Sequence, residues 1–195
     1  MKNVPQLRFK AFSGEWKSKK VSEILEPVSD KVNVEKDKFY SQIGIRSHGK
    51  GIFYKDPVLG LALGNKRVFW IKENVFIVNI VFAWEQAIAI TTSKEIGMIA
   101  SHRFPMYKPV NQLCRVDYIV YFFLTQKGKL LLEFASPGGA GRNKTLGQNE
   151  FKKLAFPIPS LEEQTKIAKF LTTIDDKISQ LSRKVELLKD RKSVV

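Results

Sequence analysis

The sequence predicts an α+β fold: one globular β-rich domain with packed helices, followed by a long C-terminal coiled-coil helix. Three patterns predict it. Short β-branched and aromatic runs fill residues 39–110, apolar residues recur at helical spacing over 117–134, and a 4-3 apolar repeat runs from Ile167 to Leu188. Because 195 residues suit one ordinary domain and an appendage, we expect a domain over 1–159 and a helix over 160–195.

The domain is expected to begin with a short helix over about 18–26. Val21, Ile24 and Leu25 share one helical face there, and Pro27 cannot continue the turn. The runs from FYSQIGI to FPMYKPV that follow are separated by Gly, Asn or Asp. This punctuation is typical of a compact sheet, so we expect mainly antiparallel strands over 39–110.

A second helix is expected over 117–134, packed on the sheet. Asp117 can cap its first turn, and six residues recur at helical spacing: Ile119, Phe122, Phe123, Gln126, Leu130 and Leu131. The glycine-rich, basic SPGGAGRNKTLGQ that follows is a loop by composition, and LAFPIP is strand-like.

The C-terminal segment is expected to form a helix that pairs with another helix. Ser160 and Glu163 form a capping box after Pro159. Seven apolar residues then occupy alternating a and d positions of a heptad repeat: Ile167, Leu171, Ile174, Ile178, Leu181, Val185 and Leu188. The alternative is that this stripe folds back onto the domain core. Since no second β-rich region follows, a partner helix has to come from another chain.

A formal net charge of +14 makes a polyanion the first partner to consider, whether DNA, RNA or an anionic membrane. Residues 160–195 hold 8 Lys+Arg and 6 Asp+Glu, so 25 and 13 remain in residues 1–159. The excess therefore sits on the domain. Cys114 is the only cysteine, which rules out an internal disulfide and favours the cytoplasm. No signal peptide is apparent, and no apolar run reaches the ~20 residues that span a bilayer.

No complete catalytic motif is present, and no cofactor or metal is expected. The sequence lacks a nucleotide-binding P-loop, a GxGxxG segment, a zinc-binding HExxH or paired CxxC, and the Asn-Pro-Pro-aromatic motif of an amino-methyltransferase. Asp117, Glu150 and Lys152 could hold Mg²⁺ and its water. They leave open a small Mg-dependent DNA endonuclease with a dimerising helix, although Asp117 fits a helix cap and Glu150 follows a flexible loop.

Two basic, glycine-rich segments have the composition of DNA-reading loops. Such loops neutralise phosphates with Lys and Arg and reach base edges with Arg, Asn or Gln. A third candidate is a pair of basic residues at the start of the RVFWIK strand. The candidates are Arg46, Ser47, His48 and Lys50 in the first segment, Arg142, Asn143 and Lys144 in the second, and Lys66 and Arg67 in the third. Any one of them could instead be a solvated surface residue.

Several strings resemble the specificity subunits of type I restriction-modification systems. PQLRFKAFSGEWKSKKVSEI resembles the start of a recognition domain in that family, and IGIRSHGKGIF and FAWEQAIAI are similar to segments inside such domains. FPIPSLEEQTKIAKFLTTIDDKISQL resembles the family's strand and spacer helix. The resemblance implies a target-recognition domain for half of a split double-stranded DNA site. It also implies a helix that docks modification (methyltransferase) subunits and, through them, a restriction subunit. The S-adenosylmethionine and ATP would then be bound by those partners.

The sequence departs from the family's full-length pattern, which has two recognition domains and two helices in one chain. It resembles a half-subunit, whether a natural short form, a truncated product or an excised fragment. Two copies could restore the symmetry as a homodimer with antiparallel helices, which would imply a palindromic split site. A helix of 32 residues spans about 48 Å, or about 14 base pairs. A fragment that only titrates modification subunits is a third interpretation.

Overall fold

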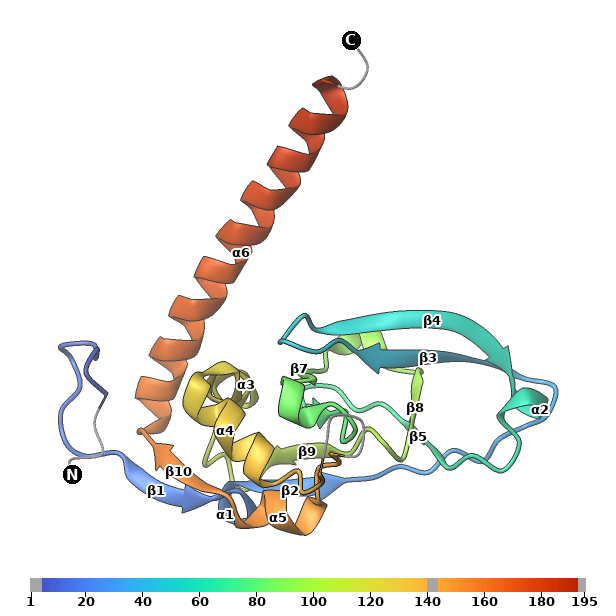
Figure 1. The fold of residues 1–195 in the computed structure, drawn as a ribbon, viewed down its shortest axis with the longest axis horizontal. Helices are drawn as coiled ribbons and strands as arrows, with labels where there is room; N and C mark the ends of the chain where they lie inside the picture. The colour runs from blue at the N-terminus through green and yellow to red at the C-terminus, as the bar shows by residue number, and fades with distance from the viewer. Residues whose placement is uncertain (1–4, 140–143, 193–195) are drawn as a thin grey trace.

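The computed structural model describes residues 5–139 and 144–192. Its β-rich part contains two four-stranded sheets, and a long helix projects away from them (Figure 1). The first sheet has the order β2-β9-β6-β7, with strands Leu25–Val28, Met106–Pro109, Phe76–Val78 and Ile88–Ile90. The second sheet has the order β4-β3-β8-β5, with strands Ile52–Leu59, Phe39–Ile45, Ile99–Ser101 and Val68–Trp70. All neighbouring pairs are antiparallel except β3 and β8, which confirms the expected β-rich region.

The remaining elements connect and cover these sheets. A two-stranded sheet pairs β1 (Lys17–Lys20) with β10 (Ala155–Ile158), so it brings the N-terminal segment to the root of the last helix. The helices are α1 Val21–Ile24, α2 Gly60–Leu63, α3 Val116–Leu124, α4 Gln126–Phe134, α5 Gln148–Lys153 and α6 Leu161–Lys192. Two 3-10 turns complete the domain: η1 Ala83–Glu85 connects β6 and β7 of the first sheet, and η2 Ser93–Glu95 lies between β7 of the first sheet and β8 of the second.

The predicted helix over 18–26 is wrong except for one turn. Only Val21–Ile24 is helical, and its neighbours on both sides are the strands β1 and β2. Val21, Ile24 and Leu25 are buried, so the sequence correctly marked the inward face. Pairing of β1 with β10 and of β2 with β9 overrides the local helical preference of the flanking residues.

The predicted helix over 117–134 is two helices that meet at Thr125. The backbone of Thr125 is extended, and its hydroxyl accepts a hydrogen bond from the Gly128 amide at 3.1 Å. A Cβ on Gly128 would lie 2.2 Å from the Phe122 carbonyl oxygen, so glycine permits the tight turn. The break shifts the helical phase, and Gln126 and Leu130 are therefore exposed rather than packed on the sheet.

Asp117 also differs from its predicted role as the residue that caps this helix. Arg115 occupies the position before the first turn, and Asp117 lies inside that turn. Its carboxylate accepts a hydrogen bond from the Tyr118 amide at 2.8 Å and pairs with the Arg115 guanidinium at 2.6 Å.

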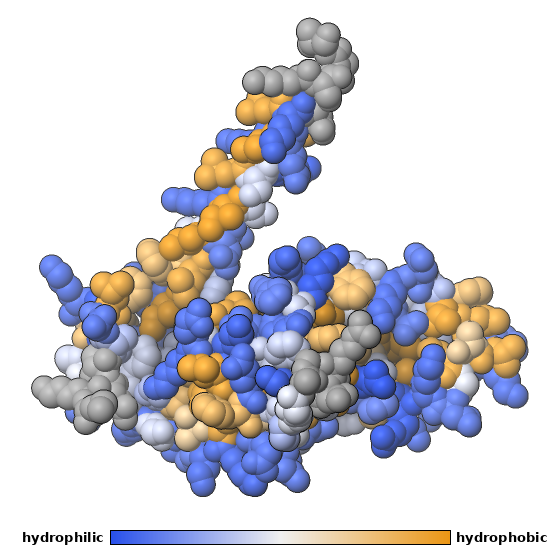
Figure 2. Space-filling model, in the orientation of Figure 1, coloured by the Kyte–Doolittle hydropathy of each residue, from blue (hydrophilic) through white to orange (hydrophobic). Residues whose placement is uncertain are grey.

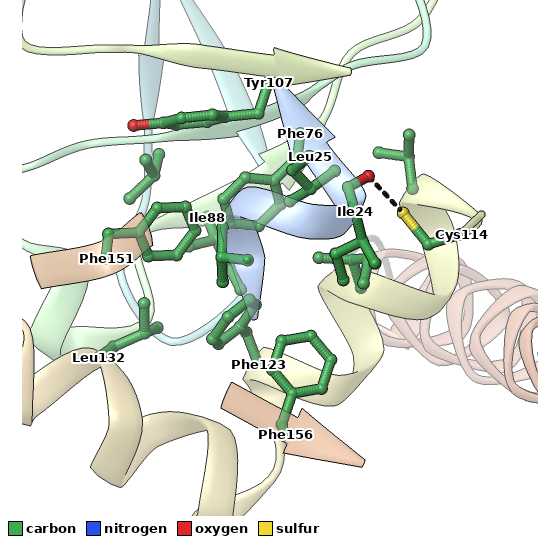
Figure 3. Close-up of a cluster of buried hydrophobic side chains, with 14 of the residues drawn as sticks. Ile24, Leu25, Phe76, Ile88, Tyr107, Cys114, Phe123, Leu132, Phe151 and Phe156 are labelled. Carbon is green, nitrogen blue, oxygen red and sulfur yellow. Dashed lines mark hydrogen bonds between the residues drawn. The ribbon is translucent and has the colours of Figure 1, made fainter. Parts of the chain in front are cut away.

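The main core lies between the first sheet and the helices α1, α3, α4 and α5 (Figure 3). Aromatic rings dominate it: Phe76 stacks on Phe151 with ring centroids 5.9 Å apart, and Phe123 meets both Phe76 and Phe156 within 6 Å. Cys114 is buried at its edge, where its thiol donates to the Ile24 carbonyl at 3.3 Å. A second cluster fills the space between the two sheets. These clusters fix the sheet ends from which the polar loops emerge.

The last helix begins where the sequence predicts. The Ser160 hydroxyl accepts a hydrogen bond from the Glu163 amide at 3.3 Å. Gln164 is buried and joins α6 to the domain: its side-chain oxygen accepts from the Arg115 amide at 2.9 Å, and its nitrogen donates to the Pro159 carbonyl at 3.0 Å. No helix in 5–139 or 144–192 is long and apolar enough to cross a membrane.

Candidate nucleic-acid interface

The first predicted loop, residues 46–51, closes the β3–β4 hairpin. Ile45 pairs with Ile52, and the Arg46 amide donates to the Gly51 carbonyl at 2.9 Å. Gly49 and Gly51 have φ angles of 65° and 75°, which glycine adopts without strain. The glycines noted in the sequence thus serve the expected purpose of allowing a tight turn.

This loop is hydrogen-bonded to the η1 turn. The His48 amide donates to the Glu85 carbonyl at 2.7 Å, and the Gly49 amide donates to the Gln86 carbonyl at 3.1 Å. The Ser47 hydroxyl donates to the Glu85 carboxylate at 2.7 Å. Gln86 is in turn tied to the end of α3, because its side-chain amide donates to the Phe123 carbonyl at 2.9 Å. Three hydrogen bonds therefore hold the loop to η1, and a fourth joins η1 to the helical core.

Arg46 is partly occupied by contacts within its own hairpin. Its guanidinium lies 4.9 Å from the centroid of the Phe53 ring and donates to the Ile52 carbonyl at 3.1 Å. The Phe53 ring in turn covers Gly44 on the opposite strand, where a Cβ would come within 2.3 Å of it. This stack orients Arg46 and leaves the residue exposed.

The second predicted loop reaches the same turn. The ammonium of Lys144 lies 5.2 Å from the centroid of the Trp84 ring, a cation–π contact. The Leu146 amide donates to the Ile80 carbonyl at 2.8 Å, just before η1. Arg142 and Asn143 lie outside the described residues. Lys144 alone therefore represents this loop in the interface, beside the turn that also holds residues 46–51.

Lys66 and Arg67 lie elsewhere, between α2 and β5. Both are exposed, and the Arg67 carbonyl accepts from the His102 amide at 3.1 Å. With Gln148 and several apolar side chains, Arg67 and His102 line a cleft of about 280 Å³. Within the described parts of the chain, no hydrogen bond, ion pair or cation–π contact joins these residues to loop 46–51.

Sequence reasoning did not identify the η1 turn as a functional element. Trp84, Glu85 and Gln86 hold both loops, yet they fall in a short gap between two of the strand-like runs of 39–110. The αL backbone of Gln86, with φ of 59°, carries no sequence signature because the residue is not glycine. The FAWEQ string contributes to the sequence prediction only through the family resemblance.

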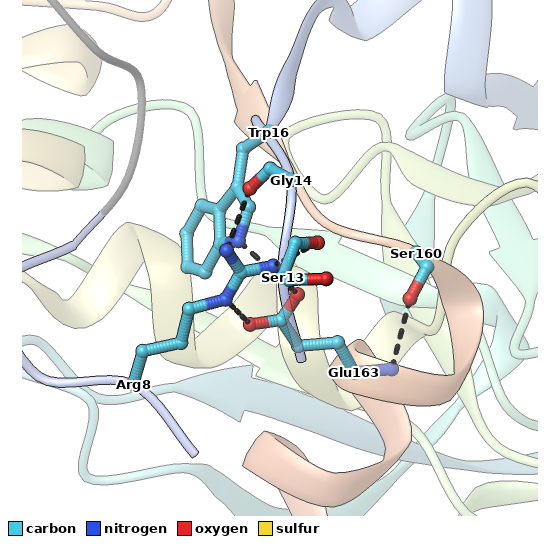
Figure 4. A network of polar contacts seen from close by, with 6 residues as sticks. All are labelled: Arg8, Ser13, Gly14, Trp16, Ser160 and Glu163. Carbon is cyan, nitrogen blue, oxygen red and sulfur yellow. Dashed lines mark hydrogen bonds and ion pairs between the residues drawn. The ribbon is translucent and has the colours of Figure 1, made fainter. Parts of the chain in front are cut away.

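The root of α6 is clamped by the N-terminal segment (Figure 4). The Arg8 guanidinium makes a two-pronged contact with the Glu163 carboxylate, with both distances 2.7 Å, and the Trp16 indole donates to the same carboxylate at 3.2 Å. The Glu163 side chain is 1% exposed. The second half of the predicted capping box is therefore replaced, since this carboxylate turns to Arg8 rather than back to the helix start.

Beyond its root, the predicted heptad seam is exposed. Ile167 and Leu171 are half-buried near Trp16 and Tyr121, but Ile178, Leu181, Val185 and Leu188 are each at least half exposed. Apolar side chains follow one side of the projecting helix (Figure 2). The alternative in which this stripe folds back onto the domain is wrong. The Tyr121 hydroxyl donates to Asp175 at 2.7 Å, and the helix leaves the domain soon after that residue.

The residues of the endonuclease alternative have separate partners. The Asp117 carboxylate is engaged by Arg115 and the Tyr118 amide, and the Glu150 carboxylate pairs with Lys153 at 2.7 Å. Across 5–139 and 144–192, no group of three or more His, Cys, Asp or Glu residues is arranged to hold a metal ion. Nothing in these contacts favours nuclease chemistry.

Comparison with known families gives one family match. The family model of the type I restriction modification DNA specificity domain matches residues 14–189. This range contains every described candidate loop and the whole predicted seam. Among curated proteins, one named as the MjaX specificity subunit of a type I restriction enzyme in Methanocaldococcus jannaschii is 25% identical over 105 residues. That alignment covers 54% of this chain and 24% of the relative.

Solved structures share the fold at low identity. The HsdS subunit from Thermoanaerobacter tengcongensis has a TM-score of 0.68 and 16% identity over 86% of this chain and 44% of its own. A structure from work on complex assembly and conformational transition of the type I R-M system gives 0.69 and 16%, with the same coverage. The S subunit of a type I system from M. genitalium gives 0.55 and 14%, covering 89% of this chain and 42% of its own. This chain thus spans less than half of each.

Proposed function

The chain belongs to the family of type I restriction modification DNA specificity domains, and on that basis we propose that it recognises DNA sequence and catalyses no reaction itself. Residues 1–159 are the target-recognition domain, and residues 160–195 form the spacer helix. One observation carries the proposal beyond the family match: the loops of residues 46–51 and 144–147 are both held against the η1 turn. Two basic segments far apart in the sequence thereby lie beside the same turn, an arrangement that suits a DNA contact.

The proposed DNA-binding set keeps the residues expected from sequence, with different roles. Arg46, His48, Lys50 and Lys144 are exposed or half-exposed around η1. Ser47 supports the loop through Glu85. Lys66 and Arg67 would form a second, separate contact, and Arg142 and Asn143 would extend the second loop.

The proposed partners are double-stranded DNA and the modification subunits of a type I system, through which a restriction subunit would be reached. The chain would act in the cytoplasm, and it would bind neither a membrane nor a cofactor. We further propose a homodimer through antiparallel α6 helices. The exposed apolar residues between Ile178 and Leu188 support it, because an apolar stripe on a projecting helix gains most by burial against a second helix.

DNA binding is tested with the purified chain and labelled duplexes at several salt concentrations. Lys50→Ala and Lys144→Ala should weaken binding to every sequence and lower the log–log salt slope by about 0.9 each. Lys38→Ala is the matched control, because Lys38 precedes β3 at the end opposite to loop 46–51 and pairs with Glu35. Equal slopes for all four proteins would refute the assignment of these loops.

Light scattering at several concentrations tests the dimer. A mass near twice 22.3 kDa supports pairing through α6, and symmetric split duplexes should then bind best. A stable monomer would mean that the helix awaits a modification subunit, and binding should then be measured with that subunit present.

The same preparation separates the competing functions. Plasmid cleavage in Mg²⁺ that is lost in Glu150→Gln would favour the endonuclease and contradict our proposal. A fragment that only titrates modification subunits would bind them normally after Arg46 and Arg142 are both replaced, and would show no sequence preference on DNA.

A further inference from the structure

The polar side chains of loop 46–51 fall into two groups, those that contact the rest of the protein and those that are exposed without a partner in the described structure. Arg46 and Ser47 are engaged within the protein, by the Phe53 ring with the Ile52 carbonyl and by the Glu85 carboxylate respectively. His48 and Lys50 are exposed, and within 5–139 and 144–192 neither side chain makes a hydrogen bond or ion pair. These two side chains differ in length and in how their backbone is held.

The backbone of His48 is held in a strained position. Its φ angle is 60°, a left-handed conformation that costs a non-glycine residue energy and persists where the surroundings impose it. Here two hydrogen bonds impose it, because the His48 amide donates to the Glu85 carbonyl and the Gly49 amide donates to the Gln86 carbonyl. Gln86 is left-handed as well, with φ of 59°. Two residues in left-handed conformations on facing turns thus fix the backbone position from which the His48 side chain extends.

Lys50 lies under a different constraint. Its amide donates only at 3.4 Å, to the Ser47 carbonyl, and its ammonium sits on a four-carbon stem. A flexible point charge suits a phosphate, since attraction to an anion depends weakly on direction. A hydrogen bond to a base edge depends on direction, so a short side chain on a fixed backbone favours it.

We propose that His48 is the specificity-determining residue of this loop and donates a hydrogen bond to an acceptor on a purine edge in the major groove, N7 or guanine O6. Lys50 then contacts the neighbouring phosphate. An imidazole carries an N–H donor on a ring with two side-chain torsions, and it can reach one base pair without loop rearrangement. The assignment rests on the proposed DNA-recognition function and names the residue that carries its selectivity.

The test is selection of bound duplexes from a randomised library by the full chain, with modification subunits added if the chain needs them. His48→Gly removes the imidazole without adding strain, because glycine favours this φ. Asparagine also tolerates the left-handed region, so His48→Asn keeps a short polar side chain on the same backbone. Lys50→Ala is the matched control in the same loop.

The expected result for His48→Gly is a loss of about tenfold in purine preference at one position of each half-site, the amount that one hydrogen bond supplies. Its salt slope should match that of the wild type. Lys50→Ala should keep the base preference and lose about 0.9 in slope. Asparagine at position 48 should shift the preference toward adenine, which it can contact in the major groove.

Two results would overturn the inference. An unchanged preference profile in His48→Gly means that another residue reads the base, and a uniform loss of binding with a lower salt slope means that His48 contacts phosphate. In both cases the wild-type chain still selects a sequence, so the proposed function stands. A wild-type chain that selects no sequence under any condition refutes both.

Discussion

Replacing Gly49 with alanine tests whether the interface is built on a rigid loop. Gly49 has φ of 65°, and a Cβ there would lie 2.5 Å from a methyl carbon of Leu124 at the end of α3. The left-handed backbone alone costs alanine about 1–2 kcal/mol. Displacing Leu124 adds an overpacking cost of about 1–3 kcal/mol. We therefore expect Gly49→Ala to lower the free energy of unfolding by about 2–5 kcal/mol.

Gly51→Ala is the matched variant that separates the two costs. Its φ of 75° is similar, but nothing within the described structure lies within 4 Å of the added carbon. It should lose only the backbone contribution, about 1–2 kcal/mol. Urea unfolding followed by tryptophan fluorescence measures both, and DNA affinity measured on the same samples should fall further for Gly49→Ala. Equal losses of stability in the two variants would refute the idea that Leu124 supports the loop.

Three further predictions concern the helix and the core. Ile178→Asp should reduce a dimer to monomers, because an unpaired charge in the seam costs about 3–5 kcal/mol, while Ser179→Asp, off the seam, should leave the mass measured by light scattering unchanged. Burial raises the pKa of the Cys114 thiol from 9.0 to about 12, so the thiol should resist maleimide at pH 8 until urea unfolds the chain. Above pH 9 the thiol of the unfolded chain loses its proton while the thiol of the folded chain keeps it. The free energy of unfolding should therefore fall as the pH rises. Arg8→Leu should lower the urea midpoint clearly, because it leaves a buried carboxylate, whereas Lys19→Ala removes an exposed ion pair and should change the midpoint little.

The long helix could be predicted from the sequence because its signals are local. A capping serine and a 4-3 apolar repeat set its start at Ser160 and its seam from Ile167 to Leu188. The α3–α4 break was missed because its cause is a close approach of Gly128 to the Phe122 carbonyl. The prediction of a helix over 18–26 was wrong for a similar reason. The strands β1 and β2 on either side of α1 pair with strands more than 75 residues away, and a local sequence pattern does not reveal such partners.

The candidate interface was only half visible in the sequence. Composition marked the two basic loops, since Lys, Arg and Gly in short segments are a local property. Their meeting point was not marked, because η1 lies between two strand-like runs, carries no glycine signal and holds residues 48 and 49 through backbone carbonyls. The Glu85 and Gln86 carbonyls accept from residues 48 and 49 whatever their side chains are.

This division between backbone and side chain bears on how specificity can change. Positions 44, 49 and 51 hold glycines that the packing or the φ angle requires, so substitution there alters the loop itself. Positions 48, 50 and 144 carry exposed or half-exposed side chains, while the loop backbone at 48 and 49 is fixed by hydrogen bonds to η1. A different residue at 48 would therefore present a different hydrogen-bonding group from the same point in space. The loop backbone and the side chain at position 48 can thus vary independently, and exchange of that one side chain should change the preferred base without changing the fold of the domain.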